Sequence, residues 1–401
     1  MAKPPILYLS YDGLTDQLGQ SQVLPYILGL CEMGYSFHIV SFEKPEKYRE
    51  NRDTIHQIIY DRPIVWHPLI YHKKPPLLST LFDLIRMQRK ALWLVKSQNI
   101  GLIHCRSYLA GLTGLKLKRK LNVKFLFDIR GFWADERIDG GIWSITHPVY
   151  RRVYNYFKKQ EIRMMQEADH IISLTQAGQK EIVSGNLFRG KVAGIPADKI
   201  TVIPCAVDLK LFDPTKISAE DRDVLRESLG LERARHILVY LGSIGTWYLL
   251  KEMLLYFKQF AKESPGSYFL FVTKDDPIVI WSKVKELGLE SSQIIISSAS
   301  RKEVPLYLSI ASLGIFFIKP SYSKKASSAT KMGEMLAMGL PIITNDIGDI
   351  RYIKNPQISI VDFETLKIDK DTTTGENIGL EYFELANGVA SYEIVYSNLL
   401  K

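Results

Sequence analysis

A lysine and a glutamate three residues apart, Lys331 and Glu334, lie where the sequence could bind an anionic ligand. They follow a hydroxyl-rich loop that leads into a predicted helix, and the first N–H groups of a helix attract anions. A lysine is unfavourable at this end unless an anion offsets its charge. We therefore predict a phosphate site with Ser327, Ser328, Thr330 and Lys331, where Glu334 accepts hydrogen bonds from sugar hydroxyls. The same residues also fit an ordinary helix start with a surface Lys–Glu pair.

A glycine-containing turn offers a second place for a phosphate. Gly242, Ser243 and Gly245 follow the predicted strand His236–Leu241. Glycines let backbone N–H groups approach a phosphate closely. Two glycines at this spacing are a weak motif, so the turn supports the first site without establishing it.

Charged residues also follow a predicted strand in the first half of the chain. The strand Phe125–Ile129 ends just before Arg130, and Asp135 and Glu136 come soon after. Arginine stays protonated, so Arg130 is no general base, but it could orient a phosphate or a hydroxyl. A structural Arg–Asp pair is the alternative.

The loop at 11–22 follows the first predicted strand, Pro5–Ser10. Ligands of parallel sheets bind beyond the carboxyl ends of the strands. Asp12, Gly19 and Gln20 are therefore candidates to contact a substrate, unless the loop is a plain connection.

The elements that position these residues alternate between strand and helix, and the alternation starts twice. A chain of 401 residues is too long for one hydrophobic core. We predict an α/β fold of two doubly wound domains with a cleft between them, residues 1–205 and 206–380, and an apolar helical tail at 381–401 that packs against the body. Within the first domain, residues 23–33 and the part of 73–97 after Pro76 read as helices, and residues 43–72 as weakly structured.

Composition limits the kind of protein. The apolar share of 46% and charged share of 24% are those of a soluble globular chain. No apolar run approaches the ~20 residues of a membrane span, and the N-terminus reads as a strand, not a signal peptide. Three widely spaced cysteines predict buried thiols in a reducing compartment. The two D-x-D triplets, at 221–223 and 369–371, lie in charged segments and read as solvated surface, so we predict no metal site.

Charge is distributed unevenly along the chain. Residues 1–205 hold 29 Lys and Arg against 18 Asp and Glu, a net +11, whereas residues 206–401 hold 23 against 25, a net −2. The first half therefore faces something anionic, such as a membrane surface or a phosphorylated lipid. No nucleic-acid-binding motif is present. The helix at 73–97 is basic and amphipathic and could lie on anionic lipid, or it is a core helix with a solvated face.

Several motifs together resemble the retaining glycosyltransferases of family 4 (group 1), which have the GT-B fold. The resemblance covers nearly the whole chain. Its segments are YLSYDGLTDQLGQSQVLPYILGLCEMGYSFHIVSF, EADHIISLT, KITVIPCAVDLKLFDP, ILVYLGSIGTW and SSATKMGEMLAMGLPIIT, of which the last two are the most specific.

The resemblance implies two Rossmann-like domains and a C-terminal helix that crosses back to the first. It implies a nucleotide-sugar donor, UDP- or GDP-linked, held mainly by the second domain without a metal. The acceptor, a lipid-linked or cell-surface glycan, would bind the first domain. We expect a cytoplasmic protein that is peripheral on the inner membrane face.

Three departures from the family pattern affect the site. The first glutamate of the family's Glu-x7-Glu pair falls on Ala326, and the expected diphosphate cations fall near Ser243 and Tyr248. Lys331 is then the remaining diphosphate cation, with Lys324 and Lys325 as backups, and Arg130 replaces a family histidine. The resulting catalytic candidates are Arg130, Lys331 and Glu334. Two alternatives stay open: a catalytically weakened nucleotide-binding subunit of a glycan-synthesis complex, and a GT-B epimerase of nucleotide sugars.

Overall fold

A computed structural model describes residues 3–121, 123–187, 194–353, 355–362, 365, 367–368 and 379–401. The chain forms two compact units. Unit 1 comprises Met1–Pro204, Tyr322–Ser328 and Leu385–Lys401, and unit 2 comprises Cys205–Ser321 and Ala329–Glu384. The predicted second domain was one continuous span, whereas here a short segment of it, Tyr322–Ser328, belongs to unit 1.

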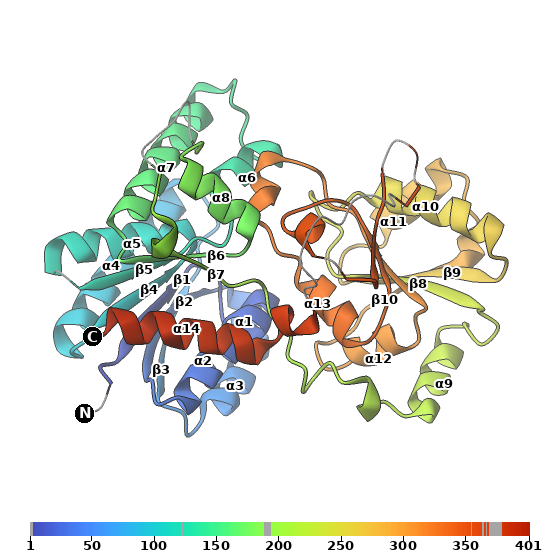
Figure 1. The fold of residues 1–401 in the computed structure, drawn as a ribbon, viewed down its shortest axis with the longest axis horizontal. Helices are drawn as coiled ribbons and strands as arrows, with labels where there is room; N and C mark the ends of the chain where they lie inside the picture. Colours follow the sequence, from blue (N-terminus) through green and yellow to red (C-terminus); the bar gives the residue numbers. More distant parts are fainter. Residues whose placement is uncertain are drawn as a thin grey trace. The chain divides into compact units, whose positions relative to one another are not determined.

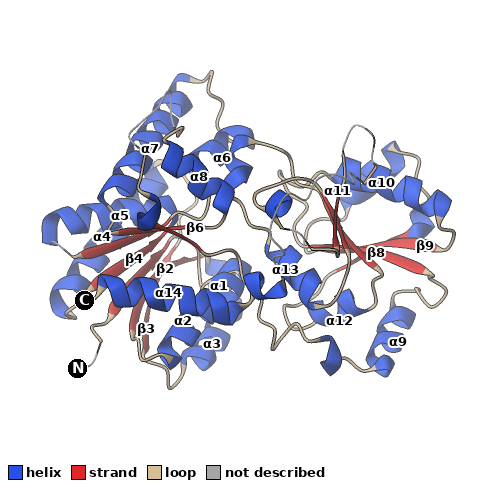
Figure 2. Ribbon diagram, in the orientation of Figure 1, coloured by secondary structure: helices blue, strands red, loops and turns tan. Residues whose placement is uncertain are grey.

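Unit 1 contains a parallel sheet covered by helices on both faces (Figures 1 and 2). Its strand order is β3-β2-β1-β4-β5-β6-β7. All strands are parallel, and the order in which they are added changes sides between β1 and β4. The apolar strands β1 and β4 are buried along their whole length, as expected at the centre of such a sheet. The strands are β1 (Ile6–Ser10), β2 (Phe37–Glu43), β3 (Ile64–Ile70), β4 (Leu102–Arg106), β5 (Lys124–Asp128), β6 (His170–Ser173) and β7 (Ile200–Val202).

The helices of unit 1 connect these strands, and the last one follows unit 2 in sequence. The C-terminal helix α14 packs beside α2, where Gly29 lets Val389 approach the α2 backbone. Figure 1 shows the two helices side by side on one face of the sheet. The helices are α1 (Gln17–Gln22), α2 (Leu24–Glu32), α3 (Pro45–Ile59), α4 (Leu78–Ser97), α5 (Ser107–Leu121), α6 (Trp133–Asp139), α7 (Pro148–Glu167), α8 (Gln176–Ser184) and α14 (Leu385–Leu399), with 3-10 helices η1 (Ala197–Lys199) and η4 (Tyr322–Ala326).

The prediction that residues 43–72 are weakly structured is wrong. They form α3 and β3. Helix α3 begins at Pro45, which suits a first helical position, and buries only Ile55 and Ile59. β3 is the edge strand of the sheet and leaves Val65 exposed. A surface helix and an edge strand bury few residues, so the apolar pattern that reveals an element is weak in both.

Unit 2 repeats the architecture with its own sheet, in the order β10-β9-β8-β11-β12-β13. The alternation predicted from the sequence is therefore confirmed as two parallel α/β units. Its strands are β8 (His236–Leu241), β9 (Ser267–Val272), β10 (Ile294–Ser297), β11 (Leu313–Phe316), β12 (Ile342–Thr344) and β13 (Ile358–Ile360). Its helices are α9 (Ala219–Ser228), α10 (Leu250–Glu263), α11 (Ile278–Glu286), α12 (Val304–Ser309) and α13 (Thr330–Ala337), with 3-10 helices η2 (Pro214–Lys216), η3 (Ser291–Gln293), η5 (Ile350–Tyr352) and η6 (Leu380–Phe383).

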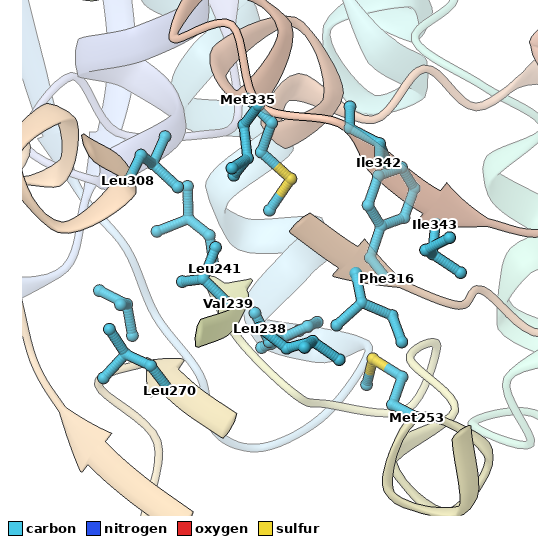
Figure 3. Packing of buried hydrophobic residues seen from close by; sticks show 14 of the residues in the cluster. Leu238, Val239, Leu241, Met253, Leu270, Leu308, Phe316, Met335, Ile342 and Ile343 are labelled. Atoms are coloured by element: carbon cyan, nitrogen blue, oxygen red, sulfur yellow. The ribbon is translucent and has the colours of Figure 1, made fainter. Parts of the chain in front are cut away.

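A single apolar cluster holds unit 2 together. Figure 3 shows Val239 and Leu241 of β8, Phe316 of β11 and Met335 of α13 in this cluster. Gly314 in β11 makes room for α13, because a Cβ at Gly314 would lie 2.6 Å from the sulfur of Met335. Helix α13 is therefore pressed onto the sheet, and its first turn is buried with it.

The three cysteines are free and buried, as the sequence predicted. Among the helices of the described residues, none is long and apolar enough to cross a membrane. The triplet at 221–223 lies on the charged helix α9, and the triplet at 369–371 lies outside the described residues.

Candidate functional site

Lys331 is the best-defined candidate of unit 2. Its neighbours Met332 and Leu336 are buried in the apolar cluster, so the close packing of α13 carries the lysine inward. The side chain is only 7% exposed. Its ammonium nitrogen lies 3.6 Å from the ring centroid of Tyr248 and 4.1 Å from that of Tyr240. The two rings form an aromatic cage around the ammonium group.

The ammonium of Lys331 makes no hydrogen bond within the described part of the chain. A Cβ placed on Gly242 would lie 3.5 Å from this nitrogen, so the predicted glycine turn does adjoin the lysine. Burial lowers the pKa of Lys331 well below its ordinary value, and only the nearby charges of Glu334 and Asp275 oppose that shift. A phosphate beside the nitrogen would supply the hydrogen bonds that the described part of the chain does not provide, and its negative charge would add to that of Glu334 and Asp275.

Glu334 has a different partner. Its carboxylate is 4% exposed and forms an ion pair with Arg301. The guanidinium of Arg301 lies 4.6 Å from the ring centroid of Phe212. The sequence analysis missed Arg301, because it precedes Glu334 by 33 residues and no motif links them. The pair holds in place the carboxylate that was predicted to accept hydrogen bonds from sugar hydroxyls, and Arg301 rather than Lys331 is its ion-pair partner.

The turn after β8 is occupied in part by a carboxylate of the chain itself. One oxygen of Asp275 accepts hydrogen bonds from the N–H of Ile244, at 2.6 Å, and from the hydroxyl of Ser243, at 2.8 Å. Gly242 has φ +102°, a conformation that favours glycine, and Gly245 is exposed. A phosphate at this turn must therefore approach Lys331 and Gly242 beside the negative charge of Asp275, which the sequence did not reveal.

The predicted phosphate loop is divided between the units. Thr330 begins α13 in unit 2, whereas Ser327 and Ser328 belong to unit 1. The structure therefore brings Thr330, Lys331 and Glu334 together on one short helix, whereas the two serines belong to the segment that precedes it in sequence.

Within unit 1, the segment Tyr322–Ser328 is held by several polar contacts. The backbone N–H of Ser323 donates to Asp139 at 3.0 Å, and Lys324 and Lys325 form ion pairs with Glu136 and Glu181 at 2.9 and 2.6 Å. Both lysines that the sequence offered as backup phosphate ligands thus have carboxylate partners.

Ala326, the position of the missing family glutamate, is 1% exposed in unit 1. Its Cβ would lie 3.0 Å from a Cβ added at Gly178. The absence of a side chain at Gly178 therefore lets helix α8 and the segment Tyr322–Ser328 pack closely at Ala326.

Arg130 lies at the carboxyl edge of the unit 1 sheet, as predicted. Its φ is +54°, a conformation that non-glycine residues rarely adopt and that often occurs at functional sites. Its guanidinium lies 3.8 Å from the carboxylate of Asp128, which also accepts a hydrogen bond from the Tyr392 hydroxyl at 3.1 Å. Burial opposes ionisation of Asp128, but Arg130 and His104 hold its pKa below the ordinary value.

Arg106 is a second arginine at this edge, and the sequence analysis did not select it. It ends β4 and pairs in register with Ser10 of β1 and Asp128 of β5. The side chain is almost fully buried and lies 3.5 Å from the carboxylate of Asp12, one of the predicted acceptor residues. Its position as the last residue of a central strand was the available signal.

The other predicted acceptor residues have structural partners. Asp135 accepts hydrogen bonds from the Tyr154 hydroxyl at 2.8 Å and from the buried Lys158 at 2.7 Å. Glu136 pairs with Lys324. Gln20 donates to the backbone oxygen of Thr15. Gly19 is needed for packing, because a Cβ there would lie 2.2 Å from the backbone oxygen of Gly13.

Chemically, unit 2 offers a buried cation for a phosphate, and unit 1 offers two arginines at a sheet edge that can orient an anion or a hydroxyl. No cluster of three or more His, Cys, Asp or Glu side chains in the described ranges has a geometry that could hold a metal ion.

Known proteins resemble this chain in sequence and in fold. Residues 23–211 match the model of Glycosyltransferase Family 4. The chain is 27% identical over 233 residues to the Bacillus subtilis (strain 168) protein "Putative teichuronic acid biosynthesis glycosyltransferase TuaH", a match that covers 58% of this chain and 53% of that protein. The chain thus spans about half the length of this curated relative.

Solved structures match over the whole chain. The sucrose-phosphate synthase of Thermosynechococcus elongatus aligns with TM-score 0.70 and 17% identity over 99% of both chains. Anabaena Alr3699/HepE, solved with UDP and glucose, aligns with TM-score 0.67 and 14% identity over 98% of this chain and 100% of that one. The UDP-GlcNAc 2-epimerase of Methanocaldococcus jannaschii aligns with TM-score 0.57 and 14% identity over 99% of both. At these identities the structures establish the fold.

Proposed function

We propose, from the premise that this chain belongs to the GT-B glycosyltransferases of the family 4 type, that it transfers a sugar from a nucleotide sugar to a lipid-linked or cell-surface glycan, with retention of configuration. The family resemblance seen in the sequence is supported by the match at residues 23–211, and the GT-B fold agrees with it. The finer statements about donor, acceptor and stereochemistry are proposals.

The observation that carries the proposal is the caged ammonium of Lys331. It is buried, it makes no hydrogen bond within the described part of the chain, and it lies beside a glycine turn. A diphosphate leaving group gains negative charge as its bond to the sugar breaks. A fixed cation in a site of low polarity stabilises that charge far better than a cation in water does. The start of α13 adds its backbone dipole.

The transfer step needs no covalent intermediate between the sugar and the enzyme. The acceptor oxygen attacks the anomeric carbon on the face that the diphosphate leaves, and the departing phosphate oxygen takes the acceptor proton. Arg130 stays protonated and so orients a phosphate or hydroxyl without accepting the proton. Glu334, fixed by Arg301, accepts hydrogen bonds from the donor's sugar hydroxyls.

Two of the compared proteins support the choice of substrates. HepE was solved with UDP and glucose, which favours a UDP-sugar donor here. The printed name of TuaH refers to teichuronic acid biosynthesis, which favours a glycan acceptor. The net +11 of residues 1–205 supports an acceptor carried on an anionic membrane surface, at its cytoplasmic face.

The direct test uses radiolabelled nucleotide sugars, UDP- and GDP-linked, with polyprenyl-diphosphate glycans as acceptors. We expect one donor to label the lipid fraction, with no requirement for an added metal ion. Lys331→Met should reduce transfer at least a hundredfold, as loss of one charge-stabilising group commonly does. Lys319→Met is a control that removes another lysine of unit 2. No transfer from any donor to any polyprenyl-diphosphate glycan would refute the acceptor.

Two alternatives have specific support. Ala326 and the carboxylate of Asp275 at the phosphate turn favour a catalytically weakened nucleotide-binding subunit. The structural match to a UDP-GlcNAc 2-epimerase favours an epimerase. Titration calorimetry with UDP, followed by product analysis of a nucleotide sugar incubated without acceptor, separates them. A weakened subunit binds UDP and leaves the sugar unchanged, whereas an epimerase changes its configuration.

A further inference from the structure

Helix α4 of unit 1 has an apolar outer face that no part of the described chain covers. Its inner face packs into the core through Met87, Ala91 and Leu94. On its outer side, large apolar side chains are between 40% and 66% exposed. These residues are Leu77, Leu78, Leu81, Phe82 and Ile85.

We call these five residues the α4 apolar face. Their spacing places them on one side of the first half of the helix, over a length of about 12 Å at 1.5 Å per residue. Scattered exposed apolar residues are ordinary, but a contiguous group of this size marks an interaction surface. The second half of the same side carries Arg89, Trp93 and Lys96.

The charges around the α4 apolar face have one sign. The segment at 71–97 contains six cations and one carboxylate, Asp83. Asp83 is fully buried, where it accepts hydrogen bonds from Tyr11 and from the backbone of His72 and pairs with the His72 ring. The segment therefore shows only positive charge to the surroundings. The cations are Lys73, Lys74, Arg86, Arg89, Lys90 and Lys96.

Two of these cations lie against aromatic rings beside the apolar face. The guanidinium of Arg86 is 5.7 Å from the ring centroid of Phe82, and the ammonium of Lys90 is 4.5 Å from that of Trp93. Side chains in this arrangement can place the apolar part in lipid while the charged group stays at the headgroup level. Tryptophan prefers that interfacial depth as well.

We propose that the α4 apolar face inserts into the surface of an anionic bilayer, with the surrounding cations bound to lipid phosphates. The charge distribution selects this occupant, because two copies of the chain meeting through this face would bring six cations against six. The proposal rests on the proposed function, in which a lipid-linked acceptor is reached from unit 1, and it assigns the membrane contact to one helix.

Flotation of the full chain with lipid vesicles tests the proposal. The vesicles contain phosphatidylcholine alone or phosphatidylcholine with phosphatidylglycerol, and we expect binding to the anionic vesicles. Replacing Leu78, Leu81 and Phe82 together by serine should weaken partitioning about a hundredfold, at about fivefold for each half-exposed side chain withdrawn from lipid. Replacing Lys73, Lys74 and Arg89 together by glutamine should weaken binding to anionic vesicles by a similar factor.

A matched control lies on α11 of unit 2, where Ile278, Val279 and Trp281 are exposed to a similar extent. Their replacement by serine should leave vesicle binding unchanged. Circular dichroism and UDP calorimetry verify that each variant is folded. Equal loss in the control, or no binding to anionic vesicles by the parent protein, would overturn the proposal. A concentration-dependent dimer that the α4 substitutions dissociate would also overturn it, in favour of a second copy.

The vesicle result is independent of catalysis. A chain that binds anionic vesicles through α4 but transfers no sugar would contradict the proposed function alone. A chain that transfers sugar to a detergent-solubilised acceptor, with α4 variants that bind vesicles normally, would contradict this inference alone.

Discussion

Binding of UDP should take up a proton at Lys331. Burial lowers the pKa of this lysine well below its ordinary value, so the free protein loses this proton at a lower pH than an exposed lysine does. A bound diphosphate stabilises the charged form and raises that pKa again. Between the two pKa values, the bound protein holds one more proton than the free protein, so UDP affinity must fall as pH rises.

The magnitude of the effect follows from linkage between UDP binding and proton binding. Because one proton is taken up with each UDP, the affinity for UDP falls by about tenfold for each unit that the pH rises. The groups that face the ammonium are the Tyr240 and Tyr248 rings and the charges of Glu334 and Asp275. Burial raises the pKa of Tyr248 to about 12, so the tyrosine stays protonated across the range used. Work between about pH 7.5 and 9 also keeps the UDP phosphates fully ionised, since their second pKa is about 6.

Titration calorimetry in buffers of different ionisation enthalpy measures the uptake directly. We expect up to one proton per UDP for the parent protein and none for Lys331→Met, which keeps the length of the side chain but cannot titrate. The variant should bind UDP more weakly and with little dependence on pH. UDP binding that is independent of pH in the parent protein, with no proton uptake, would refute the assignment of Lys331 as the diphosphate ligand.

Three further predictions concern the contacts around the two candidate sites. Arg301→Gln leaves the buried carboxylate of Glu334 without its cation and should destabilise unit 2 by about 3 kcal/mol, measured by urea denaturation; an unchanged midpoint would mean that the ion pair contributes nothing. Asp275→Asn removes a negative charge from the turn and weakens the hydrogen bond that the Ile244 N–H donates to residue 275. UDP should therefore bind about fivefold more tightly, as measured by calorimetry. Weaker binding would mean that the carboxylate orders the turn for its ligand. Gly19→Ala should lower stability by about 2 kcal/mol or more, because the added methyl group overlaps the preceding loop; a stable variant with a raised acceptor KM would instead restore the substrate-binding role predicted from the sequence.

Most of the fold could be predicted from the sequence because the sheets are parallel and buried. Strands such as β1 and β8 are continuous apolar runs, and glycines such as Gly339 end the helices beside them. The elements that were missed or misplaced are those with little buried surface. The helix predicted at 23–33 is α2, whereas the predicted loop at 11–22 contains a further short helix, α1, at Gln17–Gln22. The helix predicted after Pro76, by contrast, begins at Leu78 and agrees with the prediction.

The candidate site could be predicted only in part, for a similar reason. Lys331 and Glu334 were recognisable because they are close in sequence and start a helix. Arg301 and Asp275 follow other strands of the sheet. Only the side-by-side pairing of these strands brings Arg301 to α13 and Asp275 to the turn after β8. Their roles depend on distance in space, and sequence spacing carries no information about it.

The sequence by itself therefore determined the two-unit α/β architecture and the basic first half, and it predicted the resemblance to family 4 glycosyltransferases and Lys331 as a candidate phosphate ligand. These features follow from local patterns: apolar periodicity, helix ends and charge counts. Only the tertiary structure decided that Lys331 is caged by two tyrosines, that Glu334 is paired with Arg301, and that the segment carrying Ala326 belongs to unit 1. It also showed that α4 exposes apolar residues. Burial and pairing depend on which distant residues the fold brings together, and for that reason they required the three-dimensional structure.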